Sequence, residues 1–244
     1  MTSIGSSISS SAPDEAPRLS AIGLVPTMGP LTPSQLLRAY ALGVFPMARH
    51  RDDPRVHWID PAERGILPFE SFHIPRSLKK TLRHGGFTVT CDKAFEQVVE
   101  GCAAPAPDRP ETWINTEIVR LFVELHRLGL AHSVEAWHDG ELAGGLYGLA
   151  LGGAFFGESM FSRVPDASKV ALVNLVARLL FGGFTLLDTQ FVTRHLSRFG
   201  AVDVPRWKYL RLLSDALQRR ATFYGELPVD PLEFVSTQSK TQMS

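Results

Sequence analysis

Residues 144–190 read GGLYGLALGGAFFGESMFSRVPDASKVALVNLVARLLFGGFTLLDTQ, and the rest of the chain is organised around this stretch. It contains a glycine-rich pair of strands, a polar cluster at Glu158-Ser159, an amphipathic helix, and a strand that ends in Asp188-Thr189-Gln190. Buried or half-buried carboxylates on strands are costly unless they are paired or used in chemistry. We therefore expect this stretch to contain the reaction centre and the rest of the chain to bring substrates to it.

Glycines mark the turns of this region. Strands are predicted at 131–138, 141–151, 154–161 and 184–191. Asp139-Gly140 and Gly152-Gly153 indicate hairpin turns between the first three strands. A helix begins near Asp166, whose side chain can cap it, and ends at Gly182-Gly183. Antiparallel strands followed by a helix and a further strand indicate an α+β domain, with a mostly antiparallel sheet and flanking helices.

The residues before this domain form a smaller unit. Thr32 can cap a helix that has Pro33 at its first position. The stretch 56–69 is strand-like, but Pro61 and Pro68 interrupt it, which indicates irregular edge structure. We expect four parts in all: a disordered tail at 1–21, a small N-terminal domain at 22–67, a catalytic domain at 68–226, and a polar, frayed C-terminal tail at 227–244.

A predicted helix over 75–85 has a concentrated positive charge. Its four cations have the spacing i, i+3, i+4 and i+7, which places them on one face: Arg76, Lys79, Lys80 and Arg83. This face either binds phosphates or is simply solvated. Further helices are predicted at 93–103, 112–130 and 205–220, and a further strand at 87–92.

The composition argues against several classes of protein. The 244 residues are 44% hydrophobic, which allows a substantial core, and their formal net charge is zero. Zero net charge argues against bulk electrostatic binding to nucleic acid or membranes, but it permits a local basic patch. The two cysteines lack metal-ligand spacing, and neither a secretory signal nor a bilayer-spanning run is visible. We expect a cytoplasmic protein with reduced thiols and no metal.

The chemistry is expected at two neighbouring strands. Asp188 and Gln190 are two residues apart and therefore project from the same face of a strand. A carboxylate beside an amide can position and deprotonate an attacking amine, with Asp188 accepting the proton or polarising Gln190. Alternatively, both side chains only satisfy the end of the strand. Glu158 either stabilises an ammonium group in the same cleft or forms a surface ion pair with Arg163.

Other catalytic arrangements fit the sequence poorly. GESMF around Ser159 is not a nucleophile elbow, and the eight histidines are scattered without a metal-binding motif. The order of elements resembles the GNAT fold of N-acetyltransferases. Members of that fold that use acetyl-CoA have a glycine-containing pyrophosphate loop before the helix, whereas this junction reads SRVPDASK. We therefore expect a GNAT-like acyltransferase domain whose acyl carrier is not CoA.

Several motifs are shared with a known family. They are YALGVFPM at 40–47, RGILP at 64–68, FHIPRSLKKTL at 72–82, TWI at 112–114, LHRLGLAHSVEAW at 125–137, and then GGLYG, GESMFSR, ASK and DTQ. From about Leu31 to Leu217 the chain thereby resembles the bacterial leucyl/phenylalanyl-tRNA–protein transferases. The approach PTMGPLTP at 26–33 departs from the Gly-Gly-Asp-Leu type common in that family.

The resemblance implies a reaction and a set of site residues. Leu or Phe, less often Met, moves from Leu-tRNA or Phe-tRNA to the N-terminal Arg or Lys of a protein, which is thereby marked for degradation by the N-degron (N-end rule) pathway. No metal or other cofactor is implied, and we expect a monomer. Asp188 and Gln190 match the residues proposed to activate the acceptor amine, either chemically or mainly by positioning the substrates. The expected substrate-binding residues are Trp58, Trp113, Leu146, Glu158, Ser159 and Leu187, and the expected tRNA-binding residues are the four cations of the 75–85 helix.

Two alternatives stay open at this point. The chain could be a GNAT-fold N-acyltransferase that uses another acyl donor, which binding of acetyl-CoA would favour. It could also be a non-catalytic module that binds tRNA or peptides. The presence of both Asp188 and Gln190 argues against such a module, and an assay of transfer decides the matter.

Overall fold

The computed structural model describes residues 31–105 and 110–241, so the predicted tail at 1–21 lies outside the described residues. Two short strands, β1 (Phe45–Met47) and β2 (His57–Ile59), form a separate antiparallel pair. The strands of the main sheet are β3 (Glu63–Ile66), β4 (Phe87–Cys91), β5 (Ala131–His138), β6 (Glu141–Leu151), β7 (Ala154–Ser162), β8 (Leu186–Gln190) and β9 (Val202–Pro205).

Within the described residues, the main sheet has seven strands in the order β4-β5-β6-β7-β8-β3-β9. Its neighbouring strands are antiparallel except for β7 and β8, which are parallel. Both predicted hairpins are confirmed, and Asp139 and Gly140 have the two positive φ angles, 51° and 80°, that a tight two-residue turn needs. The predicted α+β class with a mostly antiparallel sheet is therefore confirmed.

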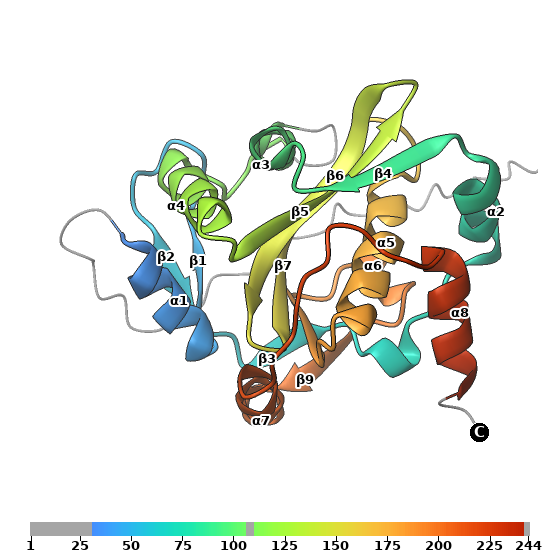
Figure 1. The fold of residues 1–244 in the computed structure, drawn as a ribbon. Coiled ribbons are helices and arrows are strands. Elements are labelled where there is room, and N and C mark those ends of the chain that lie inside the picture. Colours follow the sequence, from blue (N-terminus) through green and yellow to red (C-terminus); the bar gives the residue numbers. More distant parts are fainter. Residues whose placement is uncertain (1–30, 106–109, 242–244) are drawn as a thin grey trace, which may run out of the picture.

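Helices cover both faces of this sheet (Figure 1). They are α1 (Pro33–Ala41), α2 (Arg76–His84), α3 (Phe95–Ala103), α4 (Thr116–Arg127), α5 (Ala167–Phe181), α6 (Arg194–Ser197), α7 (Arg206–Leu217) and α8 (Pro231–Thr241), with a 3-10 turn at Phe69–Ser71. One core cluster joins α3 and α4 to side chains such as Tyr147 and Phe156. The other joins α5 and α8 to Leu146 and Phe155. Successive residues of the strands thus face opposite layers. In the part of the chain that the structure describes, no helix combines the length and the apolar character that crossing a membrane requires.

The prediction of irregular edge structure at 56–69 was wrong for Glu63–Ile66. These residues form β3, which lies inside the sheet between β8 and β9. Pro61 and Pro68 lie outside the strand, so neither removes a donor from its ladder of hydrogen bonds. The pattern of prolines therefore marked the two ends of a short interior strand.

Two further predictions were wrong: the frayed C-terminal tail and the capping of α5 by Asp166. Within the predicted C-terminal tail at 227–244, residues Pro231–Thr241 form α8 instead of fraying, and α8 packs on α5 and buries Leu232 and Val235. The Asp166 side chain does not cap α5, because it binds Thr81 of α2 and Lys169. The hydroxyl of Ser162 instead accepts the backbone N–H of Ser168, at 2.9 Å.

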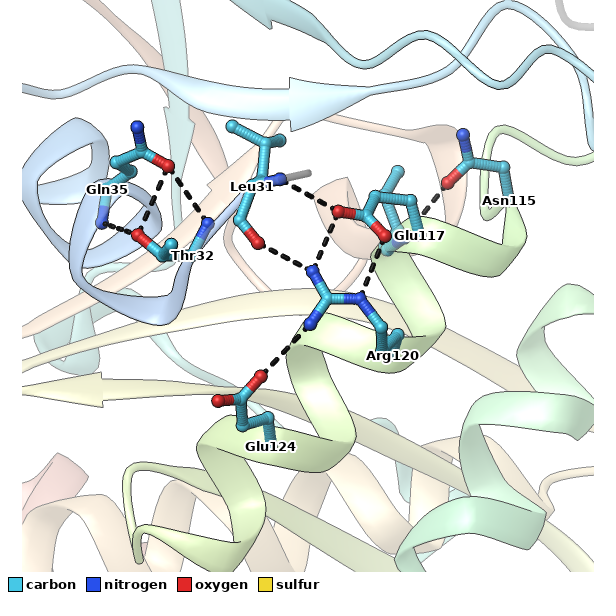
Figure 2. Close-up of polar contacts among 8 residues, drawn as sticks. Leu31, Thr32, Gln35, Asn115, Glu117, Arg120 and Glu124 are labelled. Carbon is cyan, nitrogen blue, oxygen red and sulfur yellow. Dashed lines mark hydrogen bonds and ion pairs between the residues drawn. The ribbon is translucent and has the colours of Figure 1, made fainter. Parts of the chain in front are cut away.

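The N-terminal unit is fastened to α4, as Figure 2 shows. The backbone N–H of Leu31 donates to Oε1 of Glu117 at 2.9 Å, and its carbonyl accepts from Nη2 of Arg120 at 2.5 Å. The predicted cap of α1 is confirmed, since Thr32 and Gln35 form a reciprocal capping box. These contacts set the position of α1 and, with it, of the Tyr40 side chain.

Candidate active site

A cavity of about 650 Å³ borders the carboxyl ends of the parallel strands β7 and β8. Residues of β6, β7, β8 and α5 form most of its wall, and Phe45 and Met47 of β1 close one side. Six residues predicted from the sequence line it: Trp113, Leu146, Glu158, Ser159, Leu187 and Gln190. The strands β6, β7 and β8 thus bring most of the predicted substrate-binding residues to one place.

Part of the wall is apolar. Leu146 of β6 and Leu187 of β8 face Leu172 and Leu175 of α5 within one buried cluster. An apolar group that enters here leaves water at a gain of about 25 cal/mol per Å². The cavity is therefore suited to a medium-sized apolar side chain.

Glu158 lies at an irregularity of β7. Gly157 pairs with Gly148 and Ser159 pairs with Tyr147, so Glu158 is an extra residue in the ladder, as in a β-bulge. Its Oε1 accepts the Tyr40 hydroxyl at 2.7 Å and Nε2 of Gln190 at 3.3 Å. The alternative of a surface ion pair with Arg163 is not what the structure shows, because Glu158 is buried and Arg163 donates to the Leu142 carbonyl.

Burial changes the acidity of Glu158. Its pKa is raised to about 8, chiefly because burial removes its hydration; the hydrogen bond from Tyr40 lowers the pKa, the nearby charge of Asp188 raises it, and the charge of Arg64 lowers it. A carboxyl group with such a pKa exchanges its proton near neutral pH. Because Glu158 also lines the cavity, it can give a proton to a bound molecule or take one from it.

The end of β8 is a tight left-handed turn. Gln190 has φ 57°, and the N–H of Phe191 donates to the Thr189 carbonyl at 2.6 Å across it. Non-glycine residues rarely adopt this conformation, and such strain concentrates at functional sites. A Cβ atom on Gly65 would lie 2.6 Å from the carbonyl carbon of Phe191, so only glycine lets β3 pass beneath the turn.

Asp188 lies behind this turn and is fully buried. Nε and Nη2 of Arg64 donate to its two oxygens at 3.0 and 2.7 Å, and the Tyr209 hydroxyl donates to Oδ2 at 2.6 Å. The N–H of Gln190 donates to Oδ1 at 2.8 Å. Asp188 is not among the residues that line the cavity, whereas Gln190 is.

The remaining predicted residues lie apart from the cavity wall. Trp58 of β2 is half-buried against the core and does not line the cavity. On α2, Arg76, Lys80 and Arg83 are exposed and Lys79 is half-buried. Thr81 of α2 binds Asp166, whose charge acts on the cavity-lining residue His195. This contact packs α2 against the start of α5.

Three residues of the site were missed by the sequence analysis: Tyr40, Arg64 and Tyr209. Tyr40 lies in the YALGVFPM motif, and its hydroxyl donates to Glu158, which is 118 residues away in the chain. Arg64 lies in the RGILP motif, and the one available signal was a cation in an otherwise apolar segment. Its partner Asp188 is 124 residues away in the chain, and no local pattern connects them.

Comparison with known proteins identifies the family. The model of the leucyl/phenylalanyl-tRNA protein transferase family matches residues 66–214, and that of its N-terminal domain matches residues 29–62. The chain belongs to this family. A leucyl/phenylalanyl-tRNA–protein transferase of Paramagnetospirillum magneticum is 65% identical over 196 residues, which cover 80% of this chain and 94% of the relative.

Two further transferases of the same name are similarly close. The protein of Nitrobacter winogradskyi is 61% identical and that of Rhodospirillum rubrum is 59% identical, covering 82% and 86% of this chain and 88% and 98% of the relatives. As a member of the leucyl/phenylalanyl-tRNA protein transferase family, the chain is an aminoacyltransferase. The two matched segments meet at β3, where Arg64 joins the N-terminal unit to β8.

Proposed function

We propose that this transferase moves Leu or Phe, less often Met, from aminoacyl-tRNA to the N-terminal Arg or Lys of acceptor proteins and so marks them for degradation by the N-degron pathway. The observation that supports this most strongly is a cavity in which an apolar wall adjoins the hydrogen-bonded pair Glu158–Gln190. The wall suits the side chain of the donor amino acid. The polar pair suits the amine that attacks its ester.

On the donor side, Leu146 and Leu187 would contact the Leu or Phe side chain. A difference of one methylene in such a pocket changes the binding free energy by only ~1–3 kcal/mol, which agrees with a choice among several apolar amino acids. Trp113 offers a ring on which the terminal adenosine can stack, and Trp58 is a second candidate further from the cavity. The basic face of α2 would bind tRNA phosphates.

On the acceptor side, the reaction needs a neutral α-amine. Its nitrogen attacks the ester carbonyl, the new C–N bond forms, the C–O bond to the ribose breaks, and one proton moves from the amine to the released ribose oxygen. An α-ammonium group has an ordinary pKa of about 7.7–8.0, and burial raises the pKa of Glu158 to about 8. Because the two values match, ionised Glu158 can take the first proton at little energetic cost.

Gln190 orients the same amine. Its Nε2 donates to Glu158, so its Oε1 is the amide atom that can accept an N–H of the substrate. An amide does not titrate usefully, so Gln190 orients the nucleophile and does not act as the base. We assign Gln190 and Glu158 as the residues that contact the acceptor amine, with Ser159 beside them in the cavity wall.

Several broader features belong to the same proposal. The β5–β8 region with α5 would be a GNAT-like acyltransferase domain at 68–226, and the N-terminal unit at 22–67 would be a separate small domain. The enzyme would work as a cytoplasmic monomer without CoA. The missing glycines of SRVPDASK support the last point.

The test is transfer of labelled Leu from Leu-tRNA to a protein that begins with Arg. The matched controls are the same acceptor with an acetylated α-amine and an acceptor that begins with Ser. We expect label only on the free-amine Arg acceptor. Transfer of an acetyl group from acetyl-CoA to that acceptor, without Leu transfer, would favour the N-acyltransferase alternative. Binding of tRNA without any transfer would favour the non-catalytic module.

A further inference from the structure

Asp188 has no free position for a substrate. A carboxylate offers about four acceptor positions, and Arg64 uses two of them through Nε and Nη2. The Tyr209 hydroxyl and the N–H of Gln190 use the other two. A proton from the acceptor amine could reach Asp188 only if one of these bonds broke, and Asp188 does not reach the cavity.

Arg64 is itself held in a single geometry. Its side chain is 1% exposed, and its Nη1 donates to the carbonyl of Gly43, next to the end of α1, at 3.0 Å. Its guanidinium carbon lies 4.3 Å from the ring centre of Phe45 and 4.7 Å from that of Tyr209. Two rings, one carbonyl and one carboxylate thus fix a planar cation that presents two donors in parallel.

The fixed Asp188 carboxylate in turn holds the backbone two residues further along β8. The Asp188 carboxylate binds the N–H of Gln190, a local bond of the kind by which Asp stabilises turns. Gln190 is left-handed there, so its backbone needs support to stay in that conformation. Its amide reaches Glu158 from this position.

We infer that Arg64 and Tyr209 are positioning residues of the transfer reaction: they fix Asp188, and Asp188 holds the left-handed turn from which the Gln190 amide reaches Glu158 and the cavity. The inference rests on the proposed function, and it gives Asp188 a positioning role in which it takes no proton. The N-terminal unit thereby contributes to the geometry of a site on β7 and β8.

A charge-neutral double variant separates positioning from proton transfer. Asp188→Asn alone leaves the buried Arg64 without its anion, and Arg64→Gln alone leaves the buried Asp188 without its cation, so both should lower kcat for Leu transfer by about a hundredfold. The double variant R64Q/D188N removes both charges and keeps hydrogen-bonding groups at both positions. We expect it to recover at least about tenfold over Asp188→Asn. A chemical base cannot be replaced in this way, so a double variant no faster than Asp188→Asn would overturn the inference.

Tyr209→Phe provides a milder test that keeps the ion pair intact. It removes one hydrogen bond to a charged group, so kcat should fall by about tenfold while the Kd for Leu-tRNA stays within about twofold. Tyr224→Phe, at an exposed tyrosine that packs beside Phe181, is the matched control and should leave kcat unchanged. A wild-type kcat for Tyr209→Phe would overturn the inference. This includes the case in which the Kd for Leu-tRNA and the KM for the acceptor rise equally while kcat is unchanged.

The wild-type protein distinguishes a failure of the proposed function from a failure of the positioning role. If it transfers no Leu, the proposed function fails, whatever the variants do. If it transfers Leu and the Arg64 and Tyr209 variants match it, the proposed function stands and the positioning role fails. Melting temperatures of all variants show whether a loss of kcat is simply a loss of fold.

Discussion

Replacing Glu158 by Gln should make this protein more stable above neutral pH and slower as an enzyme. Glu158 is buried, and burial raises its pKa from 4.5 to about 8. Its contribution to stability is therefore full below pH 4.5 and is lost as the pH rises towards 8, where the ionised form must be held out of water. Gln is always neutral and can keep the bonds to Tyr40 and Gln190. The variant should not show this loss.

The size of the expected gain in stability follows from the shift in the pKa of Glu158. Each pKa unit corresponds to about 1.4 kcal/mol. Between the ordinary pKa of 4.5 and pH 7.5, the variant can therefore gain at most about 4 kcal/mol in the free energy of unfolding relative to the wild type. Water that enters the cavity and local relaxation reduce this to roughly 2 kcal/mol. For a protein of this size that is a rise in Tm of about 4–8 °C.

The assay is urea unfolding and thermal melting of both proteins between pH 4 and pH 8.5. Glu141→Gln, at an exposed residue of β6, is the control and should follow the wild type at every pH. The two curves for Glu158→Gln and wild type should meet near pH 4.5 and diverge as the pH rises. Parallel curves would refute the claim that Glu158 is buried with a raised pKa, and so would a variant that is less stable at pH 8.

Three further changes test other parts of the account. Leu146→Trp should fill the apolar part of the cavity and reduce transfer of Phe at least about tenfold more than transfer of Met, and equal losses would remove Leu146 from the wall. Lys79→Ala with Lys80→Ala should flatten the plot of log K against log salt for tRNA binding by about 1.5, alike for charged and uncharged tRNA, and an unchanged slope would mean that tRNA docks elsewhere. Gly65→Ala should displace the turn at Gln190, because the added Cβ would meet the backbone of Phe191, and kcat should fall by up to about a hundredfold at unchanged tRNA affinity.

Much of the sheet could be predicted because its turns are local. Asp139-Gly140 and Gly152-Gly153 set the hairpins of β5, β6 and β7, and each pair needs only its own residues to do so. The short strands β3 and β9 were harder. β3 has four residues between prolines, and β9 leads directly into α7, so neither shows a repeat long enough to identify a strand.

The site was predicted only in part for a related reason. Glu158 and Gln190 appear in the sequence as polar residues on strands, which is unusual enough to single them out. The cluster behind them depends on contacts across 21 and 124 residues, from Tyr209 and Arg64 to Asp188. Likewise, the sequence gives no sign that Glu158 is an extra residue in its ladder, because that depends on the register with β6.

In the proposed reaction, the Gln190 amide at the cavity orients the acceptor amine during aminoacyl transfer. The single-turnover rate of Leu transfer by Gln190→Ala, with Leu-tRNA and an Arg-started acceptor both saturating, isolates this role. We expect this rate to be lower by about a hundredfold or more, with the Kd for Leu-tRNA within about twofold of the wild type. A folded variant that transfers Leu at nearly the wild-type rate would contradict it.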